Sequence, residues 1–280
     1  MKHHTFYIQA SGQSKLFAQI WQPAQNPKGV ICLVHGIGEH GSRYQAWAAR
    51  FVEANFAVVG FDQRGHGLSS GKRGVIHSYR DLMLDIDLVL VDIAVRFTDI
   101  PVFFYGHSMG GGEVLNHLLT QKSRYAAVIA TSPWIITQAA PPKFVMPFIR
   151  FLNWMLPSLR LKSKFDSSLL SHDKLVVQDY DDDTLVHHMV SFALFTGAYD
   201  AGYKILQHTD QLKKPLLLLH GAADSITNPL ASKIFAENHS EKCTFKLWQG
   251  AYHELHNELE KNQVFNFIIT WINNILEQNQ

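Results

Sequence analysis

The chain has 280 residues, of which 46% are hydrophobic and 18% are charged. That composition is typical of a packed globular protein and excludes a largely disordered chain. The formal net charge is +1 and no long basic run is present, so the sequence predicts no nucleic-acid partner.

Hydrophobic runs typical of buried strands alternate along the chain with segments of helical periodicity. The runs cover residues 29–34, 57–61, 102–105, 126–130, 216–219 and 244–248, and the helical segments cover 44–55, 79–97, 229–237 and 264–276. Nearly continuous hydrophobicity is typical of parallel strands covered on both faces. The alternation predicts a mostly parallel central sheet flanked by helices, with a ligand site at the carboxyl ends of the strands.

The alternation breaks between about residues 133 and 207, where several prolines and a run of aspartates occur. We interpret this stretch as a helical cap inserted at about residues 134–207 into a single domain that spans residues 1–280. Residues 133–159 are rich in large hydrophobic side chains, but the most apolar part, residues 144–159, is interrupted by two prolines, an arginine and an asparagine, and a transmembrane helix needs about 20 mostly apolar residues. We expect this part to line a tunnel for an acyl chain and to make peripheral contact with membranes; a core helix and a dimer contact are the alternatives.

The two cysteines and the amino terminus indicate the cellular setting. Cys32 and Cys243 lie in strand-like runs without metal-ligand spacing, which predicts two buried, reduced thiols and no metal site. Residues 1–10 lack the apolar core of a signal peptide, so we expect a cytoplasmic protein, with peripheral membrane association through the cap. Nothing in the sequence indicates a cofactor.

A candidate nucleophile follows the third hydrophobic run. Residues 102–111 read VFFYGHSMGG and contain the pattern G-x-S-x-G between a predicted strand and a helix-like segment. A serine on such a tight turn stands clear of the sheet, and the turn needs small neighbours, here Gly106 and Gly110. The pattern therefore predicts Ser108 as a nucleophile, against the alternative of a glycine-rich turn with an incidental serine. The third consecutive glycine, Gly112, has no explanation from the sequence.

An oxyanion that forms on the substrate needs hydrogen-bond donors already in place. One is expected to be the backbone N–H of Met109, which follows the nucleophile, and the other should come from the loop after an earlier strand. The glycine-rich segment HGIGEHG at residues 35–41 follows the first buried run. Ile37 is the predicted donor there, unless the segment is only a strand-to-helix turn.

Loops after two later strands supply an acid and a base in the chain order expected for this kind of site, serine, acid, histidine. Asp224 follows the run 216–219, and His253 follows the run 244–248. His256 is the alternative base. The aspartates at residues 181–183 lie in the insertion and are interpreted as a solvated face or a helix cap.

These segments resemble the monoacylglycerol lipase and lysophospholipase branch of the α/β hydrolases. The similar segments are WQP at 21–23, HGIGEH at 35–40 with RY at 43–44, FDQRGHG at 61–67, GHSMGG at 106–111, Asp224 in its loop, GAYHELH at 250–256 and, in the cap, DSSLLS at 166–171. Gln63, Leu68, the triplet at 182–184 and the pair Gly112-Glu113 depart from the family pattern.

The resemblance implies the α/β-hydrolase fold and the hydrolysis of single-chain acyl esters such as monoacylglycerols, lysophospholipids or short synthetic esters. It also implies oxyanion donors at Ile37 and Met109. The positions that match the family's alcohol-binding pocket are Glu39, Arg43, His107, Tyr180 and His256. From the residues alone, Glu39 and Arg43 are equally explained as a structural ion pair.

We therefore predict a serine carboxylic-ester hydrolase that uses Ser108, His253 and Asp224 without metal or cofactor. Acyl transfer to an alcohol or thiol and broad short-chain esterase activity would use the same residues and are the alternatives. A binding module without catalysis is disfavoured because all three residues are present. Dehalogenase chemistry needs a carboxylate nucleophile, which Ser108 excludes.

Overall fold

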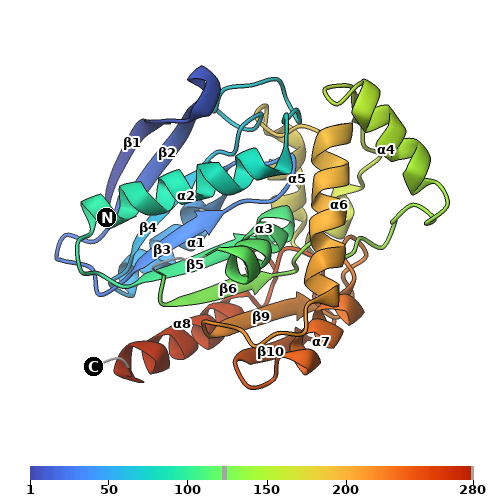
Figure 1. The fold of residues 1–280 in the computed structure, drawn as a ribbon. Coiled ribbons are helices and arrows are strands. Elements are labelled where there is room, and N and C mark those ends of the chain that lie inside the picture. Colours follow the sequence, from blue (N-terminus) through green and yellow to red (C-terminus); the bar gives the residue numbers. More distant parts are fainter. Residues whose placement is uncertain (122–124, 279–280) are drawn as a thin grey trace.

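A computed structural model describes residues 1–121 and 125–278. Its centre is an eight-stranded sheet in the order β1-β2-β4-β3-β5-β6-β9-β10 (Figure 1). β1 pairs with β2, and β2 with β4, in antiparallel fashion, and all the other neighbours are parallel. The strands are β1 (Lys2–Gln9), β2 (Lys15–Gln22), β3 (Val30–Val34), β4 (Ala57–Phe61), β5 (Val102–His107), β6 (Ala127–Thr131), β9 (Leu216–Gly221) and β10 (Cys243–Trp248). The predicted mostly parallel sheet is confirmed.

Helices cover both faces of this sheet (Figure 1). Along β3, Val30, Cys32 and Val34 join one hydrophobic core, while Ile31 and Leu33 join a second core on the opposite face. Every residue of β3 is therefore buried, which is why its sequence is continuously hydrophobic. The first core is closed by α2 (Tyr79–Arg96), α3 (Ser108–Thr120), α6 (Phe192–Gln207) and α7 (Pro229–Asn238), and the second by α1 (Gln45–Glu53) and α8 (Lys261–Gln278).

The start of α2 shows how local sequence sets an element. Ser78 adopts an extended conformation and its hydroxyl accepts a hydrogen bond from the backbone N–H of Arg80, which caps the helix. Leu82, Ile86 and Val89 recur at helical spacing and are buried in the first core. Cap and periodicity together fix both the first residue of α2 and the face that it turns to the sheet.

Two strand pairs were not predicted: the amino-terminal hairpin β1–β2 and the small antiparallel pair β7 (Arg160–Lys162) and β8 (Met189–Ser191). β1 is an edge strand with mostly exposed side chains, and β7 and β8 have three residues each. Such strands carry no continuous hydrophobic run and too few residues for an alternating pattern.

Between β6 and β9 the chain forms α4 (Met146–Met155), β7, the 3-10 turn η3 (Ser167–Leu169), α5 (Lys174–Asp182), β8 and α6. α6 contributes Ala193, Leu194, Ala198 and Ile205 to the first core, whereas Met146, the one buried residue of α4, belongs to neither core. In Figure 1, α4 stands away from the sheet. The cap assignment for about residues 134–207 is our proposal, with α6 as its base on the sheet.

Large apolar side chains of α4 face outward: Phe148 is 61% exposed, Phe151 52% and Trp154 79%. Among the helices of the described residues, none has the length and hydropathy needed to cross a bilayer. The exposed apolar face of α4 therefore lies on the surface of the protein, away from the central sheet.

Candidate active site

Ser108 lies at the junction of β5 and α3, as the first residue of the helix. Its φ of 53° falls in the left-handed region, which non-glycine residues rarely adopt. A strained strand-to-helix turn of this kind lifts the serine oxygen out of the sheet, toward the carboxyl ends of the strands. The side chain is 6% exposed and lines the main pocket.

The glycine run after Ser108 is explained by a close approach of the chain that follows β6. The Trp134 N–H donates a 2.8 Å hydrogen bond to the Ser108 carbonyl oxygen. A Cβ placed on Gly112 would lie 2.7 Å from the Trp134 carbonyl oxygen, closer than side chains tolerate. Gly112 therefore has a steric role in docking the start of the insertion onto α3.

His253 and Asp224 are joined by a short hydrogen bond. His253 Nδ1 lies 2.7 Å from Asp224 Oδ2, and both side chains are buried. Asp224 follows β9 and His253 follows β10, so adjacent parallel strands deliver the two residues to one edge of the sheet. The hydroxyl of Ser132, just after β6, donates a 2.7 Å hydrogen bond to the His253 carbonyl oxygen. This bond fixes the loop that carries His253.

The Asp224 carboxylate is surrounded by donors. Its Oδ2 also lies 3.1 Å from His220 Nε2 and accepts from the Thr227 hydroxyl at 2.8 Å, while Oδ1 accepts the backbone N–H groups of Ile226 and Thr227 at 2.7 and 3.0 Å. Burial alone would raise the pKa of Asp224, but the charge of His253 and the hydrogen bonds from both histidines lower it far below its usual range. These contacts therefore stabilise the anionic form of Asp224.

The contact between His253 and Asp224 raises the pKa of His253, whereas it lowers the pKa of Asp224. Burial would lower the pKa of His253, but the charge and hydrogen bond of Asp224, together with the charges of Glu254 and Glu39, raise the pKa above its ordinary value of 6.5. A histidine in this environment is a stronger base than a solvated one, because the cation that it forms is stabilised.

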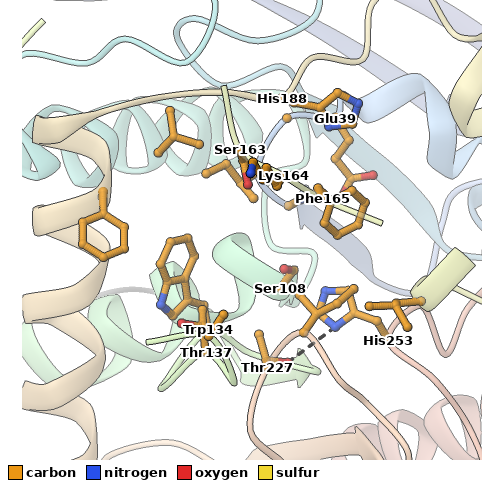
Figure 2. A pocket seen from close by; sticks show the side chains of 18 of the residues that line it. Glu39, Ser108, Trp134, Thr137, Ser163, Lys164, Phe165, His188, Thr227 and His253 are labelled. Atoms are coloured by element: carbon orange, nitrogen blue, oxygen red, sulfur yellow. Dashed lines mark hydrogen bonds between the residues drawn. The ribbon is translucent and has the colours of Figure 1, made fainter. Parts of the chain in front are cut away.

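Ser108 and His253 line one pocket, and Figure 2 shows the serine side chain beside the imidazole. Among the described residues no hydrogen bond joins the Ser108 hydroxyl to the ring. In ligand-free sites such contacts are often long and tighten only when substrate binds. Ser108 and His253 therefore lie in one pocket, as a nucleophile and its base would.

The predicted oxyanion loop also lies at Ser108. A Cβ on Gly36 would lie 3.1 Å from the Ser108 Cβ, and both Gly36 and Ile37 line the pocket. Met109 is the second residue of α3, so its N–H has no partner within the helix. Both predicted donors therefore flank the serine.

Three side chains hold the oxyanion loop in place. Glu39 accepts the Gly36 N–H at 2.6 Å, and His35 Nδ1 donates to the Gly36 carbonyl oxygen at 2.7 Å. The backbone N–H of Gln63 donates to His35 Nε2 at 2.9 Å, and the Gln63 amide donates to the His35 carbonyl oxygen at 2.8 Å. Burial lowers the pKa of His35 to about 3, so its ring is neutral and keeps one donor and one acceptor. The roles of His35 and Gln63 were not predicted from the sequence.

Arg43 joins two buried carboxylates. Its guanidinium donates to Glu39 at 2.5 Å and to both oxygens of Glu254 at 2.8 and 3.0 Å, and it lies over the ring of Tyr180 at 4.7 Å. The charge of Arg43 holds the pKa of Glu254 below its usual range despite burial, which opposes it. The ion pair between Glu39 and Arg43 is therefore present, with Glu254 as a third member that the sequence did not indicate.

His107 and His256 lie behind His253. The ring centroid of His107 is 4.8 Å from each of the other two histidine rings. His256 stacks on Tyr44 at 4.7 Å, and neither of its buried ring nitrogens has a hydrogen-bond partner in the part of the chain that the structure describes. Burial lowers the pKa of His256 to about 4, so it stays neutral. His253, not His256, contacts Asp224.

The pocket above Ser108 has a volume of about 630 Å³, within the range of small-molecule sites. In Figure 2, Ser163, Lys164, Phe165 and His188 of the insertion lie across the pocket from Ser108 and His253, whereas Trp134 and Thr137 lie beside Ser108. The wall is largely apolar, with polar groups near the serine. Lining residues outside the insertion include Gly36, Ile37, Glu39, Arg43, His107, Thr227 and Glu254, and those in the insertion include Trp134, Ile149, Leu161, Phe165, Tyr180, Val190, Phe192 and Phe195.

Comparison with known proteins identifies the chain's family. The model of a family described as Hydrolase_4, serine aminopeptidase S33, matches residues 25–260. The chain belongs to this family of α/β hydrolases. The rat monoglyceride lipase is 32% identical over 274 residues, which cover 95% of this chain and 88% of that enzyme. The resemblance predicted from the sequence is therefore confirmed.

A solved structure and a longer relative are also similar to this chain. The crystal structure of Paleococcus ferrophilus monoacylglycerol lipase has 30% sequence identity and a TM-score of 0.84, and it covers 94% of this chain and 98% of that one. An uncharacterised abhydrolase domain-containing protein of Dictyostelium discoideum is 35% identical over 270 residues, which cover 95% of this chain but 28% of that protein. The chain is a carboxylic-ester hydrolase of the α/β-hydrolase type.

Proposed function

We propose that the protein hydrolyses single-chain acyl esters through an acyl-enzyme formed on Ser108. The observation that carries this proposal is the 2.7 Å hydrogen bond between His253 and Asp224, made in the pocket where Ser108 stands on its strained turn. A serine hydroxyl is a weak nucleophile until a base removes its proton, and the base needs a carboxylate to orient it. Ser108, His253 and Asp224 have these three roles in the proposal.

The reaction has two halves. The Ser108 oxygen bonds to the ester carbonyl carbon while His253 takes the hydroxyl proton, and collapse of the tetrahedral intermediate breaks the bond to the alcohol, which leaves with that proton. A water then attacks the acyl-enzyme, gives a proton to His253, and releases the acid as Ser108 regains its hydrogen. The N–H groups of Ile37 and Met109 donate to the oxyanion in both halves.

The pocket supports a substrate with one acyl chain. Its wall of apolar side chains suits a single hydrocarbon chain, and related enzymes carry the names monoglyceride lipase and monoacylglycerol lipase. The polar groups near the serine, Glu39, Arg43 and Tyr180, are proposed to bind the alcohol part, with His107 and His256 shaping the floor beneath it. Both monoacylglycerols and lysophospholipids have this one-chain form.

The exposed face of α4 supports peripheral contact with lipid surfaces. Outward Phe148, Phe151 and Trp154 form a contiguous apolar strip beside the pocket, and Ile149 of the same helix lines the pocket. Apolar faces of this kind insert at the boundary between head groups and acyl chains. A docked α4 would bring the pocket close to the lipids that it is proposed to receive; the cytoplasmic location stays a prediction.

A fluorophosphonate probe, followed by an ester panel, tests the proposal. We expect the probe to label the protein and Ser108→Ala to abolish both labelling and turnover of monoacylglycerols, lysophospholipids and short esters. Ser240→Ala, which changes an exposed serine between α7 and β10, serves as the control that retains labelling. Labelling that persists in Ser108→Ala would refute the nucleophile, and rapid turnover of diacyl lipids would refute the single-chain substrate.

A further inference from the structure

The insertion contributes two lysines to the wall of the pocket. Lys162 is the last residue of β7 and Lys164 follows it after one residue, and both line the pocket together with Ser163 between them. In Figure 2, Ser163 and Lys164 lie across the pocket from Ser108. Within residues 1–121 and 125–278, neither ammonium group has an ion-pair or hydrogen-bond partner. Two cations on the wall of the pocket are therefore free to bind a ligand.

The strand that carries these lysines is fixed to the rest of the protein. All three residues of β7 pair with β8, and just beyond β7 the Ser163 N–H donates to the His188 carbonyl oxygen at 2.7 Å. At the start of β7, the Arg160 guanidinium donates a 2.8 Å hydrogen bond to the carbonyl oxygen of Arg73, in the loop after β4. Because the backbone is already ordered, a ligand would have to order only the lysine side chains.

The carboxylates of the pocket wall are already engaged. Glu39 and Glu254 both bind Arg43. Asp166, which also lines the pocket, caps η3 and accepts the N–H and the hydroxyl of Ser168 at 3.0 and 2.7 Å. On the insertion's side of the pocket, two lysines therefore stand against one aspartate, which leaves this side with a net positive charge.

The lysines lie at the end of the pocket where the alcohol part of the substrate is proposed to bind. The Tyr180 ring has the Arg43 guanidinium over it at 4.7 Å. The same ring lies 5.8 Å from the ring of Phe165, which directly follows Lys164, and 6.1 Å from the ring of His188. A head group that extends past Tyr180 therefore reaches the segment that carries the lysines.

We propose that Lys162 and Lys164 select single-chain lipids whose phosphate head group has a net negative charge, such as lysophosphatidylglycerol. The phosphate oxygens accept hydrogen bonds from the two ammonium groups and from the Ser163 hydroxyl. A monoacylglycerol has no charge to bind there, and a phosphocholine head group brings its own cation next to the lysines. The inference rests on the proposed function, because it names the substrate class of the same pocket.

Short-chain ether lipids test binding without turnover, because an ether has no carbonyl carbon for Ser108 to attack. We expect the wild type to bind an octyl ether with a phosphoglycerol head group about tenfold more tightly than the phosphocholine ether of the same chain. Both lipids are kept below their critical micelle concentration, so that calorimetry measures binding of single molecules. Equal affinities in the wild type would overturn the proposal.

A double variant and a matched control locate the binding site. Lys162→Gln combined with Lys164→Gln should remove the preference for the phosphoglycerol ether. Lys143→Gln removes an exposed lysine of the insertion that does not line the pocket, and it should keep the preference. A preference retained in the double variant, or lost in Lys143→Gln, would overturn the assignment to Lys162 and Lys164.

Turnover of the matching esters separates this inference from the proposed function. We expect the ratio of kcat/KM for lysophosphatidylglycerol to kcat/KM for lysophosphatidylcholine to fall about tenfold in the double variant, mainly through KM. Added salt should lower the same ratio in the wild type, because it screens exposed charges. Equal kcat/KM for the two esters in the wild type would overturn the inference alone. No turnover of either ester, with the ether preference intact, would overturn the proposed function and support the binding site.

Discussion

The pair of His253 and Asp224 determines how the protein should respond to pH. A base must be neutral to accept the serine proton, and the carboxylate raises the pKa of His253 above 6.5. We therefore expect kcat/KM on a soluble ester to rise with pH through a value above 6.5 and then level off. The low-pH limb reports His253, because the pKa of Asp224 lies far below this range.

Asp224→Asn tests this assignment at a single residue. The amide cannot stabilise the imidazolium, so we expect kcat to fall roughly 10³- to 10⁴-fold. The remaining activity should have its low-pH limb displaced toward lower pH, because the raising charge is gone. Stopped-flow rates between about pH 5 and about pH 9 measure both effects. A limb that keeps its position in Asp224→Asn would contradict the coupling.

At the scale of elements, the loop that carries His253 is fastened to the insertion. Glu254 donates its N–H to the Leu170 carbonyl oxygen at 2.8 Å. The fully buried Glu258 carboxylate accepts the Tyr252 N–H at 2.6 Å and lies 2.9 Å from His172 Nδ1. The cap segment around residue 172 is thus part of the support for the base, as well as part of the pocket wall.

Glu258→Ala should loosen this support. The change leaves buried N–H groups without an acceptor, so we expect unfolding free energy to fall by about 2–3 kcal/mol and kcat to fall by about tenfold. His172→Ala removes the partly exposed partner of the Glu258 carboxylate and should lower the unfolding free energy by less than about 1 kcal/mol. Urea denaturation and turnover of a soluble ester measure the two effects. Equal losses in the two variants would contradict the dominant role of Glu258.

The α4 helix has its own prediction. Phe148→Glu combined with Trp154→Glu puts charges on the exposed apolar face, and we expect the double variant to lose binding to phosphatidylcholine vesicles in a flotation assay. Turnover of a soluble short ester should be nearly unchanged, since neither residue lines the pocket. Val91→Lys on α2 is the matched control and should float as the wild type does. If the wild type fails to float, the proposed surface contact is wrong.

For the whole molecule, Glu113 links stability to pH. Both of its carboxyl oxygens are buried without a hydrogen-bond partner among the described residues, and burial together with the charge of Asp85 raises its pKa well above 4.5. The folded state therefore holds this proton more tightly than the unfolded state does. Its contribution to stability is fully present below about pH 4.5 and is lost as the pH rises toward the folded pKa.

Glu113→Gln should remove this loss of stability at rising pH. Between about pH 5 and about pH 9 we expect the unfolding free energy of the wild type to drop by at least about 1 kcal/mol more than that of the variant, since one unit of pKa corresponds to about 1.4 kcal/mol. Glu277→Gln changes an exposed acid at the end of α8 and should follow the wild type. Parallel curves for wild type and Glu113→Gln would contradict the buried, protonated carboxyl.

The sequence predicted the parts of the molecule that local pattern encodes. Strands such as β3 are hydrophobic on both faces, and the G-x-S-x-G turn needs small residues at fixed spacing, so both leave a trace in a few adjacent letters. His220, Gln63 and Glu254 were not predicted to take part, because their roles arise from contacts between loops that only the folded sheet brings together. β1 was missed because an exposed edge strand resembles a loop in sequence, and the buried β2 was missed because Gln19 interrupts its hydrophobic residues.

One guanidinium lies between two buried anions that come from distant parts of the chain: Arg43 bridges Glu39 beside the oxyanion loop and Glu254 next to His253. Replacing the cation alone would trap two like charges in a dry interior, whereas exchanging all three for neutral side chains would trap none. The three side chains therefore depend on one another: loss of the arginine alone would push apart the oxyanion loop and the loop that carries His253.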